Sequence, residues 1–311
     1  MSFFLGIDAG GSKTECVLAD AAGSVLARAT SGGANLQRIS AAELHTTLRA
    51  ALEELRRTAG LSFLVTEAVC AGFAGAGLRE PRALARDVLA ALLRPRYLYV
   101  VGDMEVALEA AVGAGPGVVL VAGTGSIAYG RNQLGQQARA GGRGPLLDEG
   151  SGFDIGRHGL ALLRPAEDAR GPTTRLTRLV RQSLGANNID ELGAPLSPQP
   201  VAALAALVPH VVKAARSGDA HAQEILQQAG TALARLALTV LGELGLRETE
   251  VRVATAGGVF SESAEVFARV REEIGAAAPR AVVEPLGVAP ADGAVRLAQR
   301  LWLQEQARAP A

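Results

Sequence analysis

Cysteine is scarce in this chain of 311 residues, which has only Cys16 and Cys70. Two cysteines so far apart exclude a zinc ribbon and a disulfide framework. Both lie in apolar segments typical of strands, where a buried free thiol is the usual state. The sequence therefore predicts no cysteine-bound metal, and we expect a cytoplasmic protein.

Long apolar runs and clusters of basic residues are also missing. No segment approaches the roughly 18 apolar residues that a membrane span needs, and no basic segment followed by an apolar stretch opens the chain. The formal net charge is +0, and Lys13 and Lys213 are the only lysines. We therefore expect neither a membrane nor a nucleic-acid partner.

The first part of the chain that carries chemistry is a glycine-rich turn after an apolar strand. The strand, residues 3–8, ends on Asp8, and a second apolar run occupies residues 16–19. Backbone N–H groups of such a turn bind phosphate, and a nearby carboxylate can hold the accompanying metal. The residues of the turn are Gly10, Gly11, Ser12, Lys13 and Thr14.

This turn differs from a Walker A loop, because Ser12 occupies the lysine position and a strand rather than a helix follows. The alternative is an ordinary hairpin whose glycines supply positive φ angles. The same pattern returns, however, in residues 117–130, where the turn is Gly123, Thr124, Gly125 and Ser126. Two such hairpins favour a duplicated domain with phosphate-binding turns facing each other across a cleft.

Between the two hairpins, the sequence alternates between strands and helices. We expect a third strand at 24–29, a helix at 40–59 begun by a capping box, a strand at 67–75, a helix at 82–93 and a strand at 97–101. This order predicts an α/β fold with a mixed sheet and helices on its faces. The length and the hydrophobic content of 49% suit two packed domains.

Asp103 follows the strand at 97–101 and precedes a helix at 104–112. A carboxylate there lies at the edge where open α/β sheets bind ligands. The alternative is that Asp103 only caps the helix.

A second glycine-rich stretch, residues 140–156, contains the acidic pair Asp148 and Glu149 and leads into a helix. It can bind the hydroxyls of a polar ligand, or it can be only a helix entry loop. Residues 159–246 read as mostly helical, and their histidines lack metal-ligand spacing.

Paired glycines, Gly257 and Gly258, end a strand at 251–256, where a flat ring such as adenine can approach bare backbone. A helix at 262–274, a strand at 281–283 and a helix at 291–306 complete the expected elements.

Together these motifs resemble the BadF/BadG/BcrA/BcrD-type ATPases and, within them, the N-acetylglucosamine kinases of the actin, sugar kinase and Hsp70 superfamily. The resemblance implies two RNase H-like (actin-like ATPase) domains, each with a mixed β-sheet, and a nucleotide cleft between them. It implies an N-terminal domain at 1–112, a second domain with a helical insertion at 113–290, and a C-terminal helix at 291–311 that packs on the first domain.

The resemblance also implies ATP and Mg²⁺ as cofactors and an amino sugar, such as N-acetylglucosamine or glucosamine, as the phosphate acceptor. Asp8 would hold Mg²⁺, and Asp103 would accept the proton of the sugar hydroxyl. The two glycine turns would bind the phosphates, and Gly257 and Gly258 would border adenosine. The implied sugar-binding residues are Asn35, Gly75, Thr124, Gly142, Arg143, Asp148 and Glu149.

The chain departs from this family at three places. Arg143 stands where relatives specific for N-acetylglucosamine carry tryptophan, a glycine before Asp148 is missing, and Asp154 replaces an aromatic residue. Our hypothesis is that Arg143 reaches a more polar or anionic part of the substrate.

Two other functions remain open. One is an ATP-driven activator of a 2-hydroxyacyl-CoA dehydratase or benzoyl-CoA reductase, which holds an iron–sulfur cluster through cysteines at a dimer interface. The other is a non-catalytic sugar or nucleotide sensor, for which we expect no room for a DNA-binding domain before Phe3. Homodimers are common among the relatives.

Overall fold

The computed structural model describes residues 2–61, 65–77, 79–193 and 199–308. The chain divides into two compact units, which we call unit 1 (1–115 and 286–311) and unit 2 (116–285). In the described part of the chain, no helix has the length and apolar character needed to cross a membrane.

Unit 1 is built on a five-stranded mixed sheet with the order β3-β2-β1-β4-β5. The first three strands along the chain pair in an antiparallel manner, and β4 and β5 extend the sheet in parallel with β1. The strands are β1 (Phe3–Ala9), β2 (Lys13–Asp20), β3 (Val25–Gly32), β4 (Ala68–Phe73) and β5 (Tyr97–Gly102).

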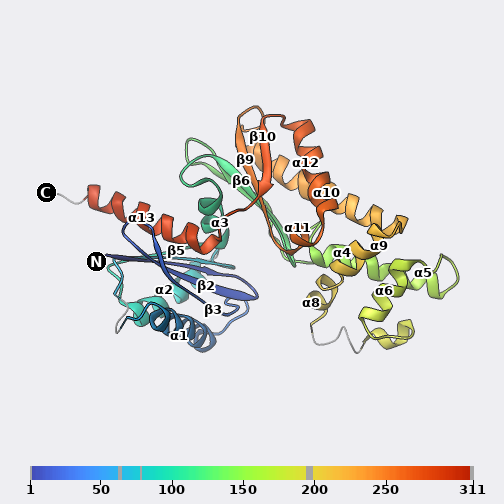
Figure 1. Cartoon of the computed structure of the whole chain (residues 1–311), viewed down its shortest axis with the longest axis horizontal. Helices are drawn as coiled ribbons and strands as arrows, with labels where there is room; N and C mark the ends of the chain where they lie inside the picture. The colour runs from blue at the N-terminus through green and yellow to red at the C-terminus, as the bar shows by residue number, and fades with distance from the viewer. Residues whose placement is uncertain (1, 62–64, 78, 194–198, 309–311) are drawn as a thin grey trace. The chain divides into compact units, whose positions relative to one another are not determined.

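Helices cover both faces of this sheet (Figure 1). Alternate side chains of each strand point to opposite faces, so Leu5 and Ile7 pack against one helix pair, while Phe4 packs against the other. The first pair is α1 (Ala41–Thr58) and α2 (Arg79–Leu93), and the second is α3 (Asp103–Val112) and α13 (Pro290–Arg308).

Unit 2 repeats this sheet. Its strands are β6 (Gly117–Ala122), β7 (Ser126–Arg131), β8 (Gln137–Gly141), β9 (Val251–Ala256) and β10 (Ala281–Pro285). They are ordered β10-β9-β6-β7-β8. The first three along the chain, β6, β7 and β8, pair in an antiparallel manner, and β9 and β10 extend the sheet in parallel with β6. The predicted fold class, a duplicated α/β domain with a mixed sheet in each half, is confirmed.

A helical insertion separates β8 from β9, as the composition of residues 159–246 predicts. It contains α4 (Gly152–Ala161), α5 (Leu163–Glu167), α6 (Arg175–Ser183), the 3₁₀ turn η1 (Ile189–Leu192), α8 (Pro200–Ala205), α9 (Val208–Arg216) and α10 (Ala220–Glu243). Between β9 and β10 lie α11 (Gly258–Glu262) and α12 (Ala264–Ala277). The short helix α11 was not predicted, because five residues are too few to show a helical period.

Local signals correctly marked the start of α1. The Ser40 hydroxyl accepts the N–H of Glu43 (3.3 Å), and the Glu43 carboxylate accepts the N–H of Ser40 (2.9 Å). These two bonds form the predicted capping box, which satisfies N–H groups that a helix start otherwise leaves unpaired.

The interface between α3 and α13 is close and partly ionic. A Cβ atom on Gly293 would lie 2.2 Å from the main-chain oxygen of Val106, so only glycine allows this approach. The Arg300 guanidinium donates to both carboxylate oxygens of Glu109, at 3.1 and 2.5 Å, and Glu109 is only 3% exposed. These contacts hold α3, and therefore Asp103 at its start, on α13.

We expect Arg300→Ala to destabilise the protein by about 2–3 kcal/mol, because the Glu109 carboxylate would remain buried without its main counter-charge. The measurement is the midpoint of thermal unfolding. The matched control is Arg308→Ala, which removes an exposed pair with Glu305 (4.0 Å) on the same helix and should cost at most about 0.5 kcal/mol. Equal midpoints for the two variants would contradict the prediction.

Candidate active site

Two carboxylates lie at the C-terminal ends of the parallel strands of the unit 1 sheet. Asp8 lies near the end of β1, and Asp103 is the first residue of α3, directly after β5. The strand between them, β4, carries Gly72 as the register partner of Asp8. A Cβ atom on Gly72 would lie 2.5 Å from Cγ2 of Val106 and 3.3 Å from Cα of Asp103. A larger residue would therefore push α3 away from the sheet, and sequence reasoning missed this glycine.

Burial disfavours the charged forms of both acids, and the charge of Asp103 adds to this effect at Asp8. The pKa of Asp8 is raised from 3.8 to about 7, first by burial, then by the charges of Asp103 and Glu15, while Lys13 lowers it. Burial also raises the pKa of Asp103, against the effect of the Met104 N–H, which donates to its carboxylate (3.0 Å). Gly102, not Asp103, is the N-cap residue of α3.

Such a site fits a divalent cation. Mg²⁺ uses one or two protein carboxylates and completes its shell with water and phosphate oxygens. Burial and like charges disfavour the ionised form of the Asp8 carboxyl group. A bound cation would favour that ionised form and so lower the pKa. No cluster of three or more potential metal ligands occurs among the described residues, so Asp8 would act with few protein partners.

The predicted phosphate turn of unit 1 joins β1 and β2. The Gly10 N–H donates to the main-chain oxygen of Lys13 (2.9 Å), and the Gly10 oxygen accepts the N–H of Ala34 (2.9 Å). A Cβ atom on Gly33 would lie 2.3 Å from the main-chain oxygen of Gly11. The loop after β3 therefore supports the turn, and Gly33 is a second position that sequence reasoning missed.

The side chains of the turn differ in direction. Gly11, Ser12 and Lys13 are exposed. Thr14 is fully buried and is the register partner of Ala9, so its hydroxyl points to the face covered by α1, opposite to Asp8. That hydroxyl has no hydrogen-bond partner among the described residues. The role of Thr14 in phosphate binding stays a prediction.

Lys13 lies on the same face of the sheet as Asp8. Its ammonium group contacts Glu15 (3.1 Å), and Glu15 also accepts from Arg28 (3.3 Å). Arg28 in turn contacts Asp292 (2.5 Å) at the start of α13. Lys13 is therefore the outermost residue in a series of ion pairs beside Asp8, and its side chain is 63% exposed.

Asn35 and Gly75 are brought together, as their common assignment to the sugar requires. The Asn35 side-chain oxygen accepts the N–H of Gln37 (2.9 Å), and the Leu36 N–H donates to the oxygen of Ala74 (2.9 Å). A Cβ atom on Gly75, where φ is +86°, would lie 3.0 Å from Oδ1 of Asn35.

The corresponding turn of unit 2, residues 123–126, is held by the start of α4. The Gly152 N–H donates to the oxygen of Gly123 (2.7 Å), and the Phe153 N–H donates to that of Thr124 (3.3 Å). The Ser126 hydroxyl donates to the oxygen of Glu149 (2.6 Å). These bonds leave the Thr124 side chain exposed.

Asp148 joins this turn to the following glycine-rich loop. It is 5% exposed, and its two carboxylate oxygens accept the N–H groups of Arg143 (2.8 Å) and Ser126 (3.3 Å). Gly125 leaves room for it, because a Cβ there would lie 2.6 Å from Oδ2 of Asp148. Asp148 thus fixes the loop conformation, and its predicted contact with sugar hydroxyls stays a prediction.

The other residues of this loop are available to a ligand. Gly142, Arg143 and Glu149 are exposed. Asp154 accepts the N–H of Gly150 (3.0 Å) and contacts Arg157 (2.8 Å). Asp154 therefore stabilises the segment that carries Glu149.

The predicted adenosine segment lies against the end of β6. Gly257 has a φ of +102°, and a Cβ atom on it would lie 2.3 Å from the main-chain oxygen of Ala122, the residue before the turn at 123–126. Gly258 has open space at its Cβ position, and both glycines are exposed. In unit 2, the phosphate turn and the adenosine segment are therefore neighbours.

The two cysteines are unsuited to an iron–sulfur cluster. Both are fully buried, and they point to opposite faces of the unit 1 sheet. Burial raises the pKa of the Cys16 thiol to about 12 and that of Cys70 still further. Neither can readily supply the thiolate that a cluster requires.

Two sheets with the same strand order and glycine-rich turns at matching positions define the class of actin-like ATPases. Comparison with known proteins specifies the family. A family model described as the BadF/BadG/BcrA/BcrD ATPase family matches residues 5–298. The chain belongs to this family.

Two proteins with similar sequences are named as kinases. The chain is 30% identical over 302 residues to an N-acetylmuramic acid/N-acetylglucosamine kinase of Clostridium acetobutylicum, covering 96% of this chain and 99% of that protein. It is 32% identical over 260 residues to an N-acetyl-D-glucosamine kinase of Dictyostelium discoideum, covering 79% and 82%. The prediction of an ATP-using kinase is confirmed.

Among solved structures, a candidate N-acetylglucosamine kinase of Chromobacterium violaceum superposes with a TM-score of 0.79 at 27% identity. The alignment covers 96% of this chain and 99% of that one. The likeness extends through both units and the insertion.

The raised pKa of Asp8 predicts a pH-dependent loss of stability in the protein without metal or nucleotide. In the unfolded chain Asp8 ionises near pH 4, and in the folded protein near pH 7. Folding therefore favours the protonated form, and this stabilisation is lost as the pH rises from about 4 to 7.

Asp8→Asn cannot ionise, so we expect it to exceed the wild type in stability by about 1–3 kcal/mol above pH 7 and by little near pH 4. The measurement is Tm against pH in EDTA. Parallel curves for the two proteins would contradict the assignment.

Proposed function

We propose that this protein is an ATP-dependent kinase that transfers the γ-phosphate to a hydroxyl of an amino sugar, such as N-acetylglucosamine or glucosamine. The observation that carries the proposal is the placement of Asp8 and Asp103 at one edge of the unit 1 sheet, across Gly72. The full-length similarity to an N-acetylmuramic acid/N-acetylglucosamine kinase supports the choice of acceptor.

The two carboxylates have different tasks in this reaction. Phosphoryl transfer requires in-line positioning and neutralisation of charge on the phosphates. Asp8 would hold Mg²⁺, which would supply that neutralisation, and Asp103 accepts the proton of the attacking hydroxyl. A base with a raised pKa holds such a proton better, and the pKa of Asp103 is raised.

The remaining residues bind the two substrates. The phosphate groups bind at the turns of residues 10–14 in unit 1 and 123–126 in unit 2, with Lys13 adding a positive charge. Gly257 and Gly258 border adenosine. Sugar hydroxyls contact Asn35, Gly75, Thr124, Gly142, Arg143, Asp148 and Glu149, of which Glu149 has an exposed carboxylate.

Arg143 affects the choice among sugars. Its side chain is exposed, while its main-chain N–H donates to Asp148. A guanidinium recognises carboxylates by paired hydrogen bonds. An acceptor that bears a carboxylate, as N-acetylmuramic acid does, would therefore gain a contact that a neutral sugar lacks.

The first experiment is an ATP-consumption assay with glucosamine, N-acetylglucosamine, N-acetylmuramic acid and glucose. We expect phosphorylation of amino sugars, and we expect Arg143→Ala to lower kcat/KM for N-acetylmuramic acid at least 5-fold more than for N-acetylglucosamine. Arg139→Ala, at an exposed arginine of β8, is the matched control. Strong preference of the wild type for the neutral N-acetylated sugar would count against the role of Arg143, and no sugar-dependent ATP consumption would refute the kinase.

Asp103→Asn tests the base. We expect ATP affinity within about twofold of the wild type and sugar phosphorylation reduced by roughly 10²–10⁴, because the substitution removes proton acceptance and retains shape. Asp87→Asn, at an exposed position of α2, should have no effect. Turnover of Asp103→Asn near that of the wild type would exclude Asp103 from this role.

A further inference from the structure

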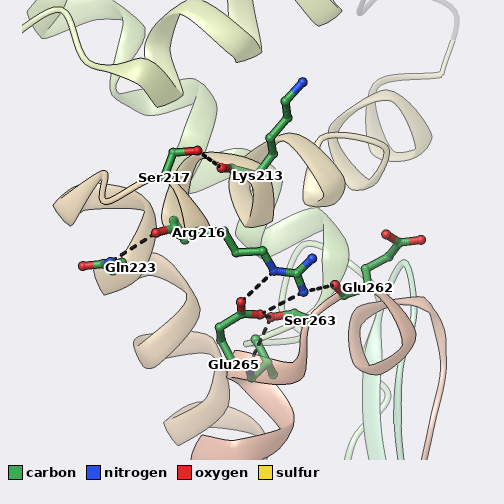
Figure 2. A network of polar contacts seen from close by, with 9 residues as sticks. Lys213, Arg216, Ser217, Gln223, Glu262, Ser263 and Glu265 are labelled. Carbon is green, nitrogen blue, oxygen red and sulfur yellow. Dashed lines mark hydrogen bonds and ion pairs between the residues drawn. The ribbon is translucent and has the colours of Figure 1, made fainter.

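Unit 2 contains a polar network that the proposed reaction does not use. It centres on Arg216, the last residue of α9 (Figure 2). The guanidinium donates through Nε to Oε1 of Glu265 (2.8 Å), and through Nη2 to Oε2 of Glu265 (3.4 Å) and to the main-chain oxygen of Glu262 (3.2 Å). One side chain of the helical insertion therefore contacts the end of α11 and the first turn of α12.

The junction between α11 and α12 is a single residue, Ser263. Its side chain is fully buried, and its hydroxyl accepts the N–H of Val266 (3.2 Å) and donates to Oε2 of Glu265 (3.0 Å). The Arg216 guanidinium lowers the pKa of Glu265 most, the Glu265 N–H and this serine add to the effect, and the carboxylate stays charged. Glu265 is thus held from two sides.

Arg216 lies at the end of α9, where side chains hydrogen-bond to the last carbonyl groups of the helix (Figure 2). The Ser217 hydroxyl donates to the oxygen of Lys213 (2.9 Å), and the side-chain amide of Gln223, on α10, donates to the oxygen of Ala215 (3.1 Å). These bonds satisfy carbonyl groups that the end of α9 would otherwise leave unpaired. The position of Arg216 is therefore set by the insertion.

The opposite end of α11 is the adenosine segment. Gly257 lies against the main-chain oxygen of Ala122, and Val259 is buried in the core of unit 2. Because α11 has only five residues, a shift at Glu262 is transmitted to Gly258 within little more than one turn.

We propose that Arg216 is a positioning residue for the nucleoside end of ATP. By holding Glu262 and Glu265, it keeps α11 in the place where Gly257 and Gly258 accept adenosine, without touching the nucleotide. The inference rests on the proposed function, which assigns adenosine to these glycines. It gives the helical insertion a part in nucleotide affinity.

The test compares two probes, adenosine and inorganic tripolyphosphate, as ligands measured by competition with ATP. In Arg216→Ala we expect the affinities for ATP and adenosine to fall about 3- to 10-fold, while that for tripolyphosphate, kcat and KM for the sugar stay within twofold. Arg216→Lys should be intermediate. Glu265→Gln should resemble Arg216→Ala, and the double variant should be no weaker than either single one.

Arg181→Ala is the matched control, because it removes a similar ion pair of the insertion, with Glu167 (2.6 Å), far along the chain from α11. Equal losses for adenosine and tripolyphosphate, no loss for adenosine, or the same loss in Arg181→Ala would overturn the proposal. The binding comparison needs no sugar. A wild type that binds ATP and phosphorylates no sugar would therefore refute the kinase and still decide the role of Arg216.

Discussion

The parallel strands β1, β4 and β5 end at one edge of the first sheet, and this geometry brings Asp8 and Asp103 together. The closeness of the two acids is unfavourable, because the charge of Asp103 adds to burial in raising the pKa of Asp8. Unit 1 maintains it through contacts away from the acids themselves. Gly72 allows α3 to approach the sheet, and the packing of α3 on α13 at Gly293 and Arg300 prevents α3 from moving away.

The second sheet has the same strand order and a different chemistry at the same edge. Its first strand ends in Val121 and Ala122, without a carboxylate. The buried acid Asp148 nearby accepts the main-chain N–H groups of Arg143 and Ser126. Unit 1 therefore contains the two carboxylates, and unit 2 contains a glycine turn next to Gly257 and Gly258, which we propose border adenosine. The two units share a fold, but they contribute different residues to the proposed reaction.

Exposed ion pairs generally contribute little to stability, yet their position can still matter. Arg216 contacts the main-chain oxygen of Glu262, at the end of a five-residue helix, and the carboxylate of Glu265 in the first turn of α12. The helical insertion is in this way attached to the segment proposed to border adenosine, and Asp154 attaches it to the loop of Glu149 through Gly150.

The sequence by itself determined the local features of this protein: the strand and turn patterns at 3–14 and 117–130, the capping box at Ser40, the duplicated α/β class and the family. Periodicity, turn residues and caps act between residues close in the chain, so they can be read without coordinates. The tertiary structure alone decided that Thr14 points away from Asp8, that Asp148 is occupied, that Gly72 and Gly33 are required, and that Arg216 reaches α11. Each of these depends on atoms brought together from distant parts of the chain, and no local pattern records such contacts.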